Sequence, residues 1–252
     1  MVPPGYERLL LGHAVAVARS EVAASIRRSL VGADGSRSTL LEYAARHPGA
    51  RQMQGRGAAY AAPLPQSTDR VVVRHNRHGG LFGPITGDRF LAPTRAPYEL
   101  DMSLRLAKLG VPTPQIVAYA LYPPGGLFQR ADVCSREIPG SRDLAQVLMR
   151  DNPADRAAAF AATARLVASL SRVGARHHDL NAKNILLTHE TAYVLDVDRV
   201  QLGGSPAAAL DANLARLTRS LRKWRDRFAA RISEREIAEL EASTRRALPP
   251  VE

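Results

Sequence analysis

The stretch from His177 to Arg199 constrains the fold more than any other part of the chain, and it reads HHDLNAKNILLTHETAYVLDVDR. An apolar run too short for a buried helix follows Asn184, a polar turn comes next, and a second apolar run leads into Asp196. This pattern predicts two short strands joined by a turn. A hairpin of this kind brings Asn184 and Asp196 to the same end.

The polar residues around this predicted hairpin indicate phosphoryl transfer. That chemistry needs one carboxylate at the attacking hydroxyl, and an Asn plus an Asp on magnesium. We therefore interpret Asp179 as the catalytic base, and Asn184 and Asp196 as magnesium ligands. Asp198 is a second metal ligand or a structural acid. Lys183 contacts the γ-phosphate or is a solvated loop residue. The alternative for the whole stretch is a polar loop between two core strands.

Length and composition allow one large domain or two lobes. The chain has 252 residues, 45% of them hydrophobic, which is enough to bury a substantial core. The single cysteine, Cys134, excludes an internal disulfide and is typical of a reducing compartment. We expect its thiol to be a small buried hydrophobe. No apolar run reaches the roughly 18 residues of a membrane span.

The net charge of +11 predicts an anionic partner, such as a phosphate ligand, nucleic acid or a membrane surface. No zinc spacing or nucleic-acid motif accompanies the charge, so we expect no nucleic-acid partner. Residues 206–228 form a predicted basic helix. Such a helix is a solvated face or rests on anionic lipid headgroups.

The first half of the chain contains candidate nucleotide-binding residues. In protein kinases a strand ends in a Lys that contacts the nucleotide phosphates. The strand predicted over residues 70–74 ends in Arg74, and the first lysine of the chain is Lys108. Arg74 therefore takes this role, unless Arg77 does or Arg74 is a solvated strand end. Glu99, in the first turn of a predicted helix, is the partner for Arg74 or an acid favoured by the helix dipole.

Gly55 and Gly57 form a predicted turn between two strands. Such a turn lets backbone N–H groups approach a nucleotide phosphate, although an ordinary hairpin has the same pattern. Pro139 and Gly140 mark a boundary between lobes. We predict an N-terminal extension that braces the N-lobe (1–50), the N-lobe on the nucleotide side (51–138) and the C-lobe (139–252).

Several segments together resemble the bacterial lipopolysaccharide kinases, over roughly residues 50–225. The most specific are RHNRHGG at 74–80, HHDLNAKNILL at 177–187 and LDVDR at 195–199. The resemblance implies an α+β, two-lobed, protein-kinase-like fold with a small β-rich N-lobe and a short, mostly helical C-lobe. It implies the same roles for Asp179 and the magnesium ligands, and a nucleotide-side pair of Arg74 and Glu99.

The resemblance also implies an activity. It is transfer of the γ-phosphoryl group of ATP, with Mg²⁺, to a hydroxyl of 3-deoxy-D-manno-octulosonic acid (Kdo) in lipid A-linked inner-core lipopolysaccharide. The expected partners are this glycolipid and an anionic membrane surface, with no obligate protein partner. The expected location is the cytoplasm, peripherally on the cytoplasmic face of the inner membrane.

Four alternatives remain from the sequence. One is a heptose kinase, and another is an aminoglycoside-type kinase, which the basic helices disfavour because that substrate is polycationic. A third is a protein kinase, disfavoured because no Ala-Pro-Glu segment follows Asp196. The last is a pseudokinase-like module that binds nucleotide or lipid, for which the complete set of acids gives no support.

Overall fold

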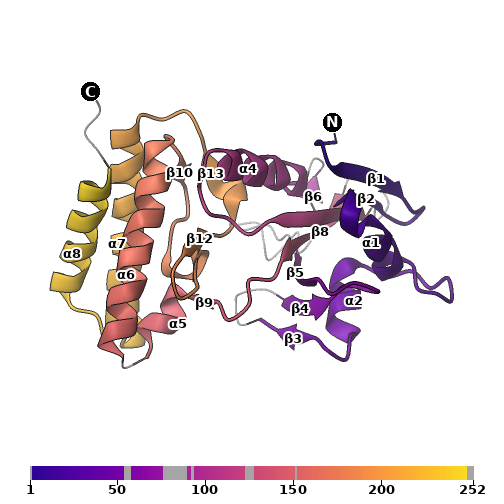
Figure 1. Cartoon of the computed structure of the whole chain (residues 1–252), viewed down its shortest axis with the longest axis horizontal. Coiled ribbons are helices and arrows are strands. Elements are labelled where there is room, and N and C mark those ends of the chain that lie inside the picture. The colour runs from indigo at the N-terminus through magenta and orange to yellow at the C-terminus, as the bar shows by residue number, and fades with distance from the viewer. Residues whose placement is uncertain are drawn as a thin grey trace. The chain divides into compact units, whose positions relative to one another are not determined.

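The structure is a computed structural model in which the chain divides into two compact units. The N-terminal unit comprises Met1–Asp101 and Gln115–Glu137, and the C-terminal unit comprises Met102–Pro114 and Ile138–Glu252. Figure 1 follows the chain through its helices and strands. The residues that the structure describes are 2–53, 58–75, 90–91, 94–122, 128–150 and 152–248.

An antiparallel sheet dominates the N-terminal unit (Figure 1). Its strands follow the order β1-β2-β7-β8-β5-β4-β3, and β6 pairs with β8 beside this path. Val71 and Val73 of β5 are buried while Val72 between them is partly exposed, which is the two-residue period of a strand with one face on a core. The strands are β1 Tyr6–Leu10, β2 Val15–Arg19, β3 Arg51–Gln52, β4 Ala59–Pro63, β5 Arg70–His75, β6 Phe90–Leu91, β7 Ile116–Tyr122 and β8 Phe128–Arg136.

Residues 1–50, the expected brace, supply β1, β2 and two helices to this unit. A short 3-10 turn, η1 (Ser20–Val22), leads into α1 (Ala23–Leu30), and α2 is Leu40–Arg46. The α2 helix begins with a capping box: the Thr39 hydroxyl accepts from Glu42 N at 3.1 Å, and the Glu42 carboxylate accepts from Thr39 N at 2.9 Å. Both helices pack their apolar sides into the same core as the β5 valines.

A buried carboxylate ties α2 to the sheet. Asp132 of β8 is fully buried, and its Oδ2 accepts from Leu41 N and from the Tyr122 hydroxyl, both at 3.0 Å. Its Oδ1 lies 2.6 Å from His75 Nδ1. The Tyr122 hydroxyl in turn accepts from Leu40 N at 2.8 Å. Burial raises the pKa of Tyr122, and the neighbouring carboxylate raises it further.

Cys134 is buried in this core, as the sequence predicted. It is fully shielded from solvent, and burial raises the pKa of its thiol well above the ordinary value. A thiol that stays protonated is a poor nucleophile, so Cys134 contributes packing.

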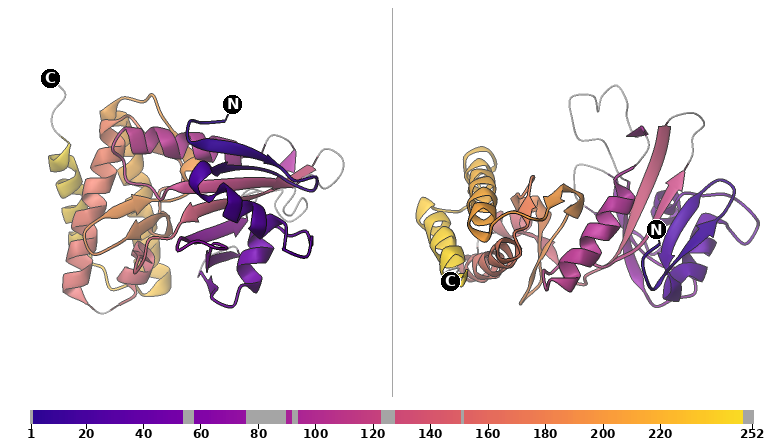
Figure 2. Two further views of the ribbon diagram at one scale, coloured as in Figure 1. Left: turned by 45° about the vertical axis from the view of Figure 1, so that its right-hand side comes forward. Right: turned by 90° about the horizontal axis from the view of Figure 1, so that it is seen from above.

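The C-terminal unit is mostly helical. Helix α4 (Ala96–Lys108) begins in the N-terminal unit and ends in this one. The helices α6, α7 and α8 lie side by side in Figures 1 and 2. The remaining elements are β9 Arg142–Asp143, α5 Leu144–Leu148, α6 Pro153–Arg172, β10 Arg176–His177, η2 Ala182–Asn184, β11 Ile185–Leu187, β12 Ala192–Val194, η3 Val197–Arg199, β13 Val200–Gln201, α7 Pro206–Phe228 and α8 Glu234–Ala247.

Helix α7 has the bounds that the sequence predicted. It begins where the Ser205 hydroxyl accepts from Ala208 N at 3.2 Å, with Pro206 in the first turn, and it ends at Ala229, whose φ is +53°. Leu214, Leu217 and other apolar residues on one side of α7 join the core of this unit. Among the helices that the structure describes, none is sufficiently long and apolar to cross a membrane.

We expect Asp132→Ala to lower the free energy of unfolding by at least about 3 kcal/mol, because the change leaves several buried donors without their acceptor. Urea unfolding followed by circular dichroism would measure the change. Asp34→Ala is the control, because Asp34 is exposed in a loop. An equal, small loss in both variants would contradict a structural role for the buried carboxylate.

Candidate active site

The predicted catalytic base lies in a loop of the C-terminal unit between β10 and η2. The carboxylate of Asp179 is exposed, and no other described residue makes a hydrogen bond to it. The residues beside it are anchored in the core, because Leu180 is 1% exposed and Ala182 is fully buried. The loop therefore holds its backbone in place while it presents one acid to solvent.

His177 fixes the position of this loop. Its Nδ1 accepts from Asp179 N at 3.1 Å, and its Nε2 lies 2.9 Å from Leu195 O. These two bonds suit a neutral ring with its proton on Nε2, which donates to the carbonyl. Burial lowers the pKa of His177, so the ring stays neutral near pH 7. One buried ring thus ties the backbone at Asp179 to the residue directly before Asp196.

The predicted hairpin is confirmed, and it brings Asn184 and Asp196 to one end. Strands β11 and β12 pair with Ile185 opposite Val194. Asn184 and Leu195, the residues next to this pair, are also hydrogen-bonded: Leu195 N donates to Asn184 O at 2.9 Å. The Asn184 side chain turns toward the loop, because its Nδ2 donates to Asp179 O at 2.9 Å. Asn184 is therefore hydrogen-bonded both to Asp179 and to Leu195, the residue directly before Asp196, all within one unit.

The oxygen atoms at this end suit a hard cation. With its Nδ2 bound to the loop, Asn184 keeps Oδ1 as the atom that can ligate, and no described residue makes a hydrogen bond to it. Magnesium in phosphoryl-transfer sites takes one or two carboxylates plus substrate phosphates and water. Within the described ranges no three His, Cys, Asp or Glu side chains gather into a metal site by themselves. Asn184 and Asp196 lie at the same end of the hairpin, and their binding of magnesium stays a prediction.

Asp196 has a left-handed backbone, with φ +53° and ψ +48°. Residues other than glycine seldom adopt this conformation, although Asp and Asn tolerate it best, and such outliers concentrate at functional sites. The turn η3 follows directly and is closed by Arg199 N, which donates to Asp196 O at 3.0 Å. The side chain of Asp198 is 10% exposed and lies 3.6 Å from Arg199 Nε.

Helix α7 also binds the backbone on both sides of Asp179, through two residues that are not among those predicted from the sequence. Asn213 is fully buried, and its Oδ1 accepts from His177 N at 2.9 Å while its Nδ2 donates to Ala175 O at 2.9 Å. The Ser220 hydroxyl accepts from Ala182 N at 3.1 Å. An Asn among the leucines of an amphipathic helix is the signal that marks Asn213.

Lys183 is in contact with α7 as well. Its Nζ lies 5.7 Å from the centroid of the Trp224 ring, within the range of a cation–π interaction. Trp224 packs against Phe228, with their ring centroids 4.5 Å apart. The structure thus gives Lys183 an aromatic neighbour, and its contact with a phosphate stays a prediction.

The predicted nucleotide-side pair lies in the N-terminal unit. Arg74, opposite Val133 in the sheet, forms an ion pair with Glu99 in the first turn of α4. Glu99 is buried, and the Arg74 side chain is 30% exposed. The paired carboxylate helps to fix the position of the guanidinium, and the contact of Arg74 with a nucleotide phosphate stays a prediction. Gly55, Gly57 and Arg77 lie outside the described residues.

Asn213→Ala should speed hydrogen exchange at the His177 amide and lower the free energy of unfolding by on the order of 1–3 kcal/mol, because buried groups lose their partner. Ser220→Ala should instead speed exchange at the Ala182 amide. Exchange measured by nuclear magnetic resonance would test both, and each variant is the control for the other. Unchanged exchange at both amides would contradict the role of α7.

Comparison with known proteins supports one family. The family model described as "Lipopolysaccharide kinase (Kdo/WaaP) family" matches residues 49–243. Several curated relatives are named 3-deoxy-D-manno-octulosonic acid kinase. The one from Vibrio vulnificus (strain CMCP6) is 35% identical over 178 residues, covering 68% of this chain and 72% of its own. The one from Stenotrophomonas maltophilia (strain K279a) is 36% identical over 193 residues, covering 74% of each chain.

A solved structure gives the fold. The protein described as "WaaP in complex with acyl carrier protein" superposes with a TM-score of 0.50 at 19% identity, covering 83% of each chain. The β-rich first part and helical second part of this chain thus form the kinase-like fold that the sequence predicted. From the family match and these relatives, the chain belongs to the lipopolysaccharide kinase (Kdo/WaaP) family.

Proposed function

We propose that this chain transfers the γ-phosphoryl group of ATP to a hydroxyl of Kdo in lipid A-linked inner-core lipopolysaccharide. The observation that carries the proposal is the hydrogen-bonded group in the C-terminal unit. His177 joins the backbone at Asp179 to Leu195, and Asn184 donates to Asp179 O. The relatives named Kdo kinase, at 35–36% identity, support this acceptor over other sugars.

In this proposal Asp179 orients the acceptor hydroxyl and accepts its proton. The hydroxyl oxygen forms a bond to the γ-phosphorus as the bond from that phosphorus to the bridging oxygen breaks, and ADP leaves with the electron pair. The exposed carboxylate of Asp179 is open to an acceptor, and its backbone is fixed by His177. Catalysis then consists mostly of positioning and charge neutralisation.

Asn184 and Asp196 would hold Mg²⁺ through Oδ1 and a carboxylate oxygen, with Asp198 as a second carboxylate or as a support for the turn. When bound, the cation neutralises charge on the β- and γ-phosphate oxygens. The protein contributes the orientation of these ligands. The bond from Asn184 Nδ2 to Asp179 O directs the amide oxygen away from the loop, and the η3 turn closes behind Asp196.

Each unit contains residues that we propose as nucleotide contacts. The guanidinium of Arg74 binds phosphate oxygens while Glu99 holds it, and Lys183 reaches the γ-phosphate. Gly55 and Gly57 would offer backbone N–H groups to the phosphates. Arginine suits this role because its planar fork donates two parallel bonds to a phosphate.

We also infer a peripheral location on the cytoplasmic face of the inner membrane. The acceptor is lipid-linked and the donor is ATP, so both substrates meet at that surface. The net charge of +11 favours approach to anionic headgroups.

Asp179→Asn should lower kcat for phosphate transfer to Kdo-lipid A precursor by on the order of 10²–10⁴-fold, because the amide cannot accept the proton. Transfer from radiolabelled ATP would measure it, with heptosyl-lipid, an aminoglycoside and a generic protein as comparison acceptors. Asp211→Asn is the control, since Asp211 is exposed on α7 and pairs with Arg245. Wild-type turnover in a folded Asp179→Asn protein would overturn the proposal.

Arg74→Gln should raise KM for ATP by about ten- to a hundredfold, because a charge-assisted contact to phosphate is lost. Arg70→Gln is the matched control: it lies on the same strand, is exposed and pairs with Glu137. Initial rates at varied ATP would separate the two. Equal KM values in both variants would remove Arg74 from the nucleotide site.

A further inference from the structure

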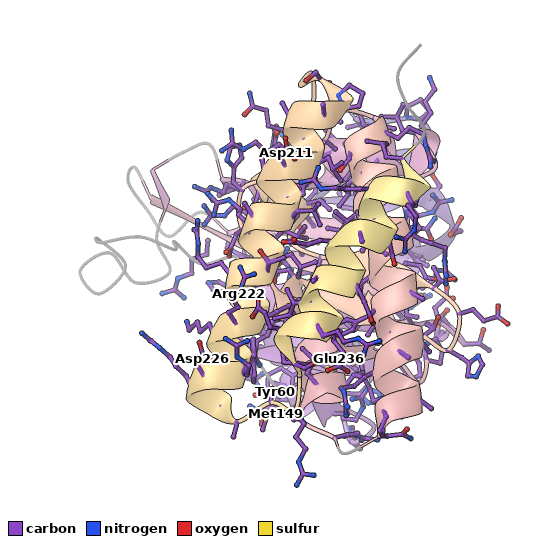
Figure 3. The ribbon with its side chains drawn as sticks, turned by 90° about the vertical axis from the view of Figure 1, so that its left-hand side faces the viewer. Tyr60, Met149, Asp211, Arg222, Asp226 and Glu236 are labelled. Carbon is purple, nitrogen blue, oxygen red and sulfur yellow. The ribbon has the colours of Figure 1, made fainter. Side chains whose placement is uncertain are left out.

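The basic residues of α7 fall into two groups. Arg222 and Arg225 both form ion pairs with Glu234 at the start of α8, at 2.9 and 2.6 Å. Figure 3 shows Arg222 on α7, with α8 running beside it. At the N-terminal end of α7, Asp211 pairs with Arg245 of α8 at 2.9 Å. These bridges use the charges on one side of the helix to hold α8.

Four other basic residues form a separate stripe. They lie three or four residues apart, and at 3.6 residues per turn they fall within about 80° of the helix surface. Each is at least partly exposed, and none makes a salt bridge to another residue that the structure describes. We call them the α7 stripe: Arg216, Arg219, Lys223 and Arg227.

The α7 stripe borders the side of the helix that contacts residues 175–183, the segment that carries Asp179 and that we call the catalytic loop. Asn213, Ser220 and Trp224 contact that loop, and they occupy the neighbouring sector of about 40° at the same helical repeat. The residues that pair with α8 lie on the opposite flank of the stripe. An anion bound along the stripe would therefore lie beside the loop that carries Asp179.

The loop extends this basic surface. Lys183 directly precedes Asn184, and its ammonium group lies over the Trp224 ring, one residue along α7 from Lys223. The ammonium group of Lys183 is thus held over the Trp224 indole, next to the α7 stripe. The positive charges run from the exposed face of α7 to the residues that act on the acceptor.

We propose that the α7 stripe binds the anionic groups of the acceptor, a sugar carboxylate or glycolipid phosphate, and so directs the acceptor hydroxyl to Asp179. This inference rests on the proposed function and adds the substrate group that this surface recognises. Arg216, Arg219 and Arg227 offer planar forks that match a carboxylate or a phosphate, and Lys223 adds a point charge. Neighbouring cations on an exposed helix face also raise the local concentration of an anionic substrate.

The test is the double variant Lys223→Gln/Arg227→Gln, assayed with a Kdo acceptor that lacks acyl chains. We expect KM for this acceptor to rise about tenfold, with KM for ATP and kcat within about twofold of wild type. The matched control is Arg235→Gln/Arg246→Gln on α8, which removes the same charge from exposed positions elsewhere. The control should keep wild-type KM for both substrates.

A second measurement separates the acceptor from the membrane. Binding of each protein to vesicles of phosphatidylglycerol and phosphatidylethanolamine, without acceptor, reports headgroup contact alone. Weaker vesicle binding in the α7 variant, with unchanged KM for the lipid-free acceptor, would overturn the inference and assign the stripe to the membrane. An equal rise of KM in both double variants would also overturn it, because net charge alone would explain the effect.

The outcomes distinguish this inference from the proposed function. Wild-type protein that transfers phosphate to the lipid-free acceptor, with the same KM in the α7 variant, supports the function and refutes the role of the stripe. Wild-type protein that transfers no phosphate to any Kdo acceptor refutes the function, and the inference with it.

Discussion

The arrangement of the proposed catalytic residues depends on one buried imidazole, that of His177. His177 joins the backbone at Asp179 to the backbone at Leu195, 16 residues further along the chain, and it does so as a neutral ring that accepts on one side and donates on the other. Burial keeps the ring neutral, because it disfavours the charged form. A protonated ring could not accept from Asp179 N, so the geometry around the base depends on the packing of the core as much as on the loop.

The long helix α7 is the second element on which the C-terminal unit depends, because its different faces make different contacts. Apolar residues such as Leu214 pack in the core, and the charged residues at both ends pair with α8. Two polar residues on a third face, Asn213 and Ser220, bind the backbone on either side of Asp179, at His177 and Ala182. A single rigid element thereby links the stability of the unit to the position of its functional residues.

The sequence predicted the elements whose signals are local. The bounds of α7 follow from Ser205, Pro206 and an apolar period, and the β11–β12 hairpin follows from two short apolar runs around a polar turn. Contacts between distant residues were not predictable in the same way. Asn213 bonds to His177 N across 36 residues, and that proximity depends on how α7 packs rather than on any spacing in the sequence. The hydrogen bond from Ala182 N to the Ser220 hydroxyl was unpredictable for the same reason.

The left-handed backbone at Asp196 has a consequence for what can replace it. A glutamate would keep the charge, but its extra methylene moves the carboxylate outward, and it lacks the short side chain that makes this conformation tolerable. Asparagine would keep the backbone shape and lose the charge. The backbone conformation and the proposed role of Asp196 as a metal ligand thus favour the same amino acid, so that substitutions usually regarded as conservative are not equivalent there.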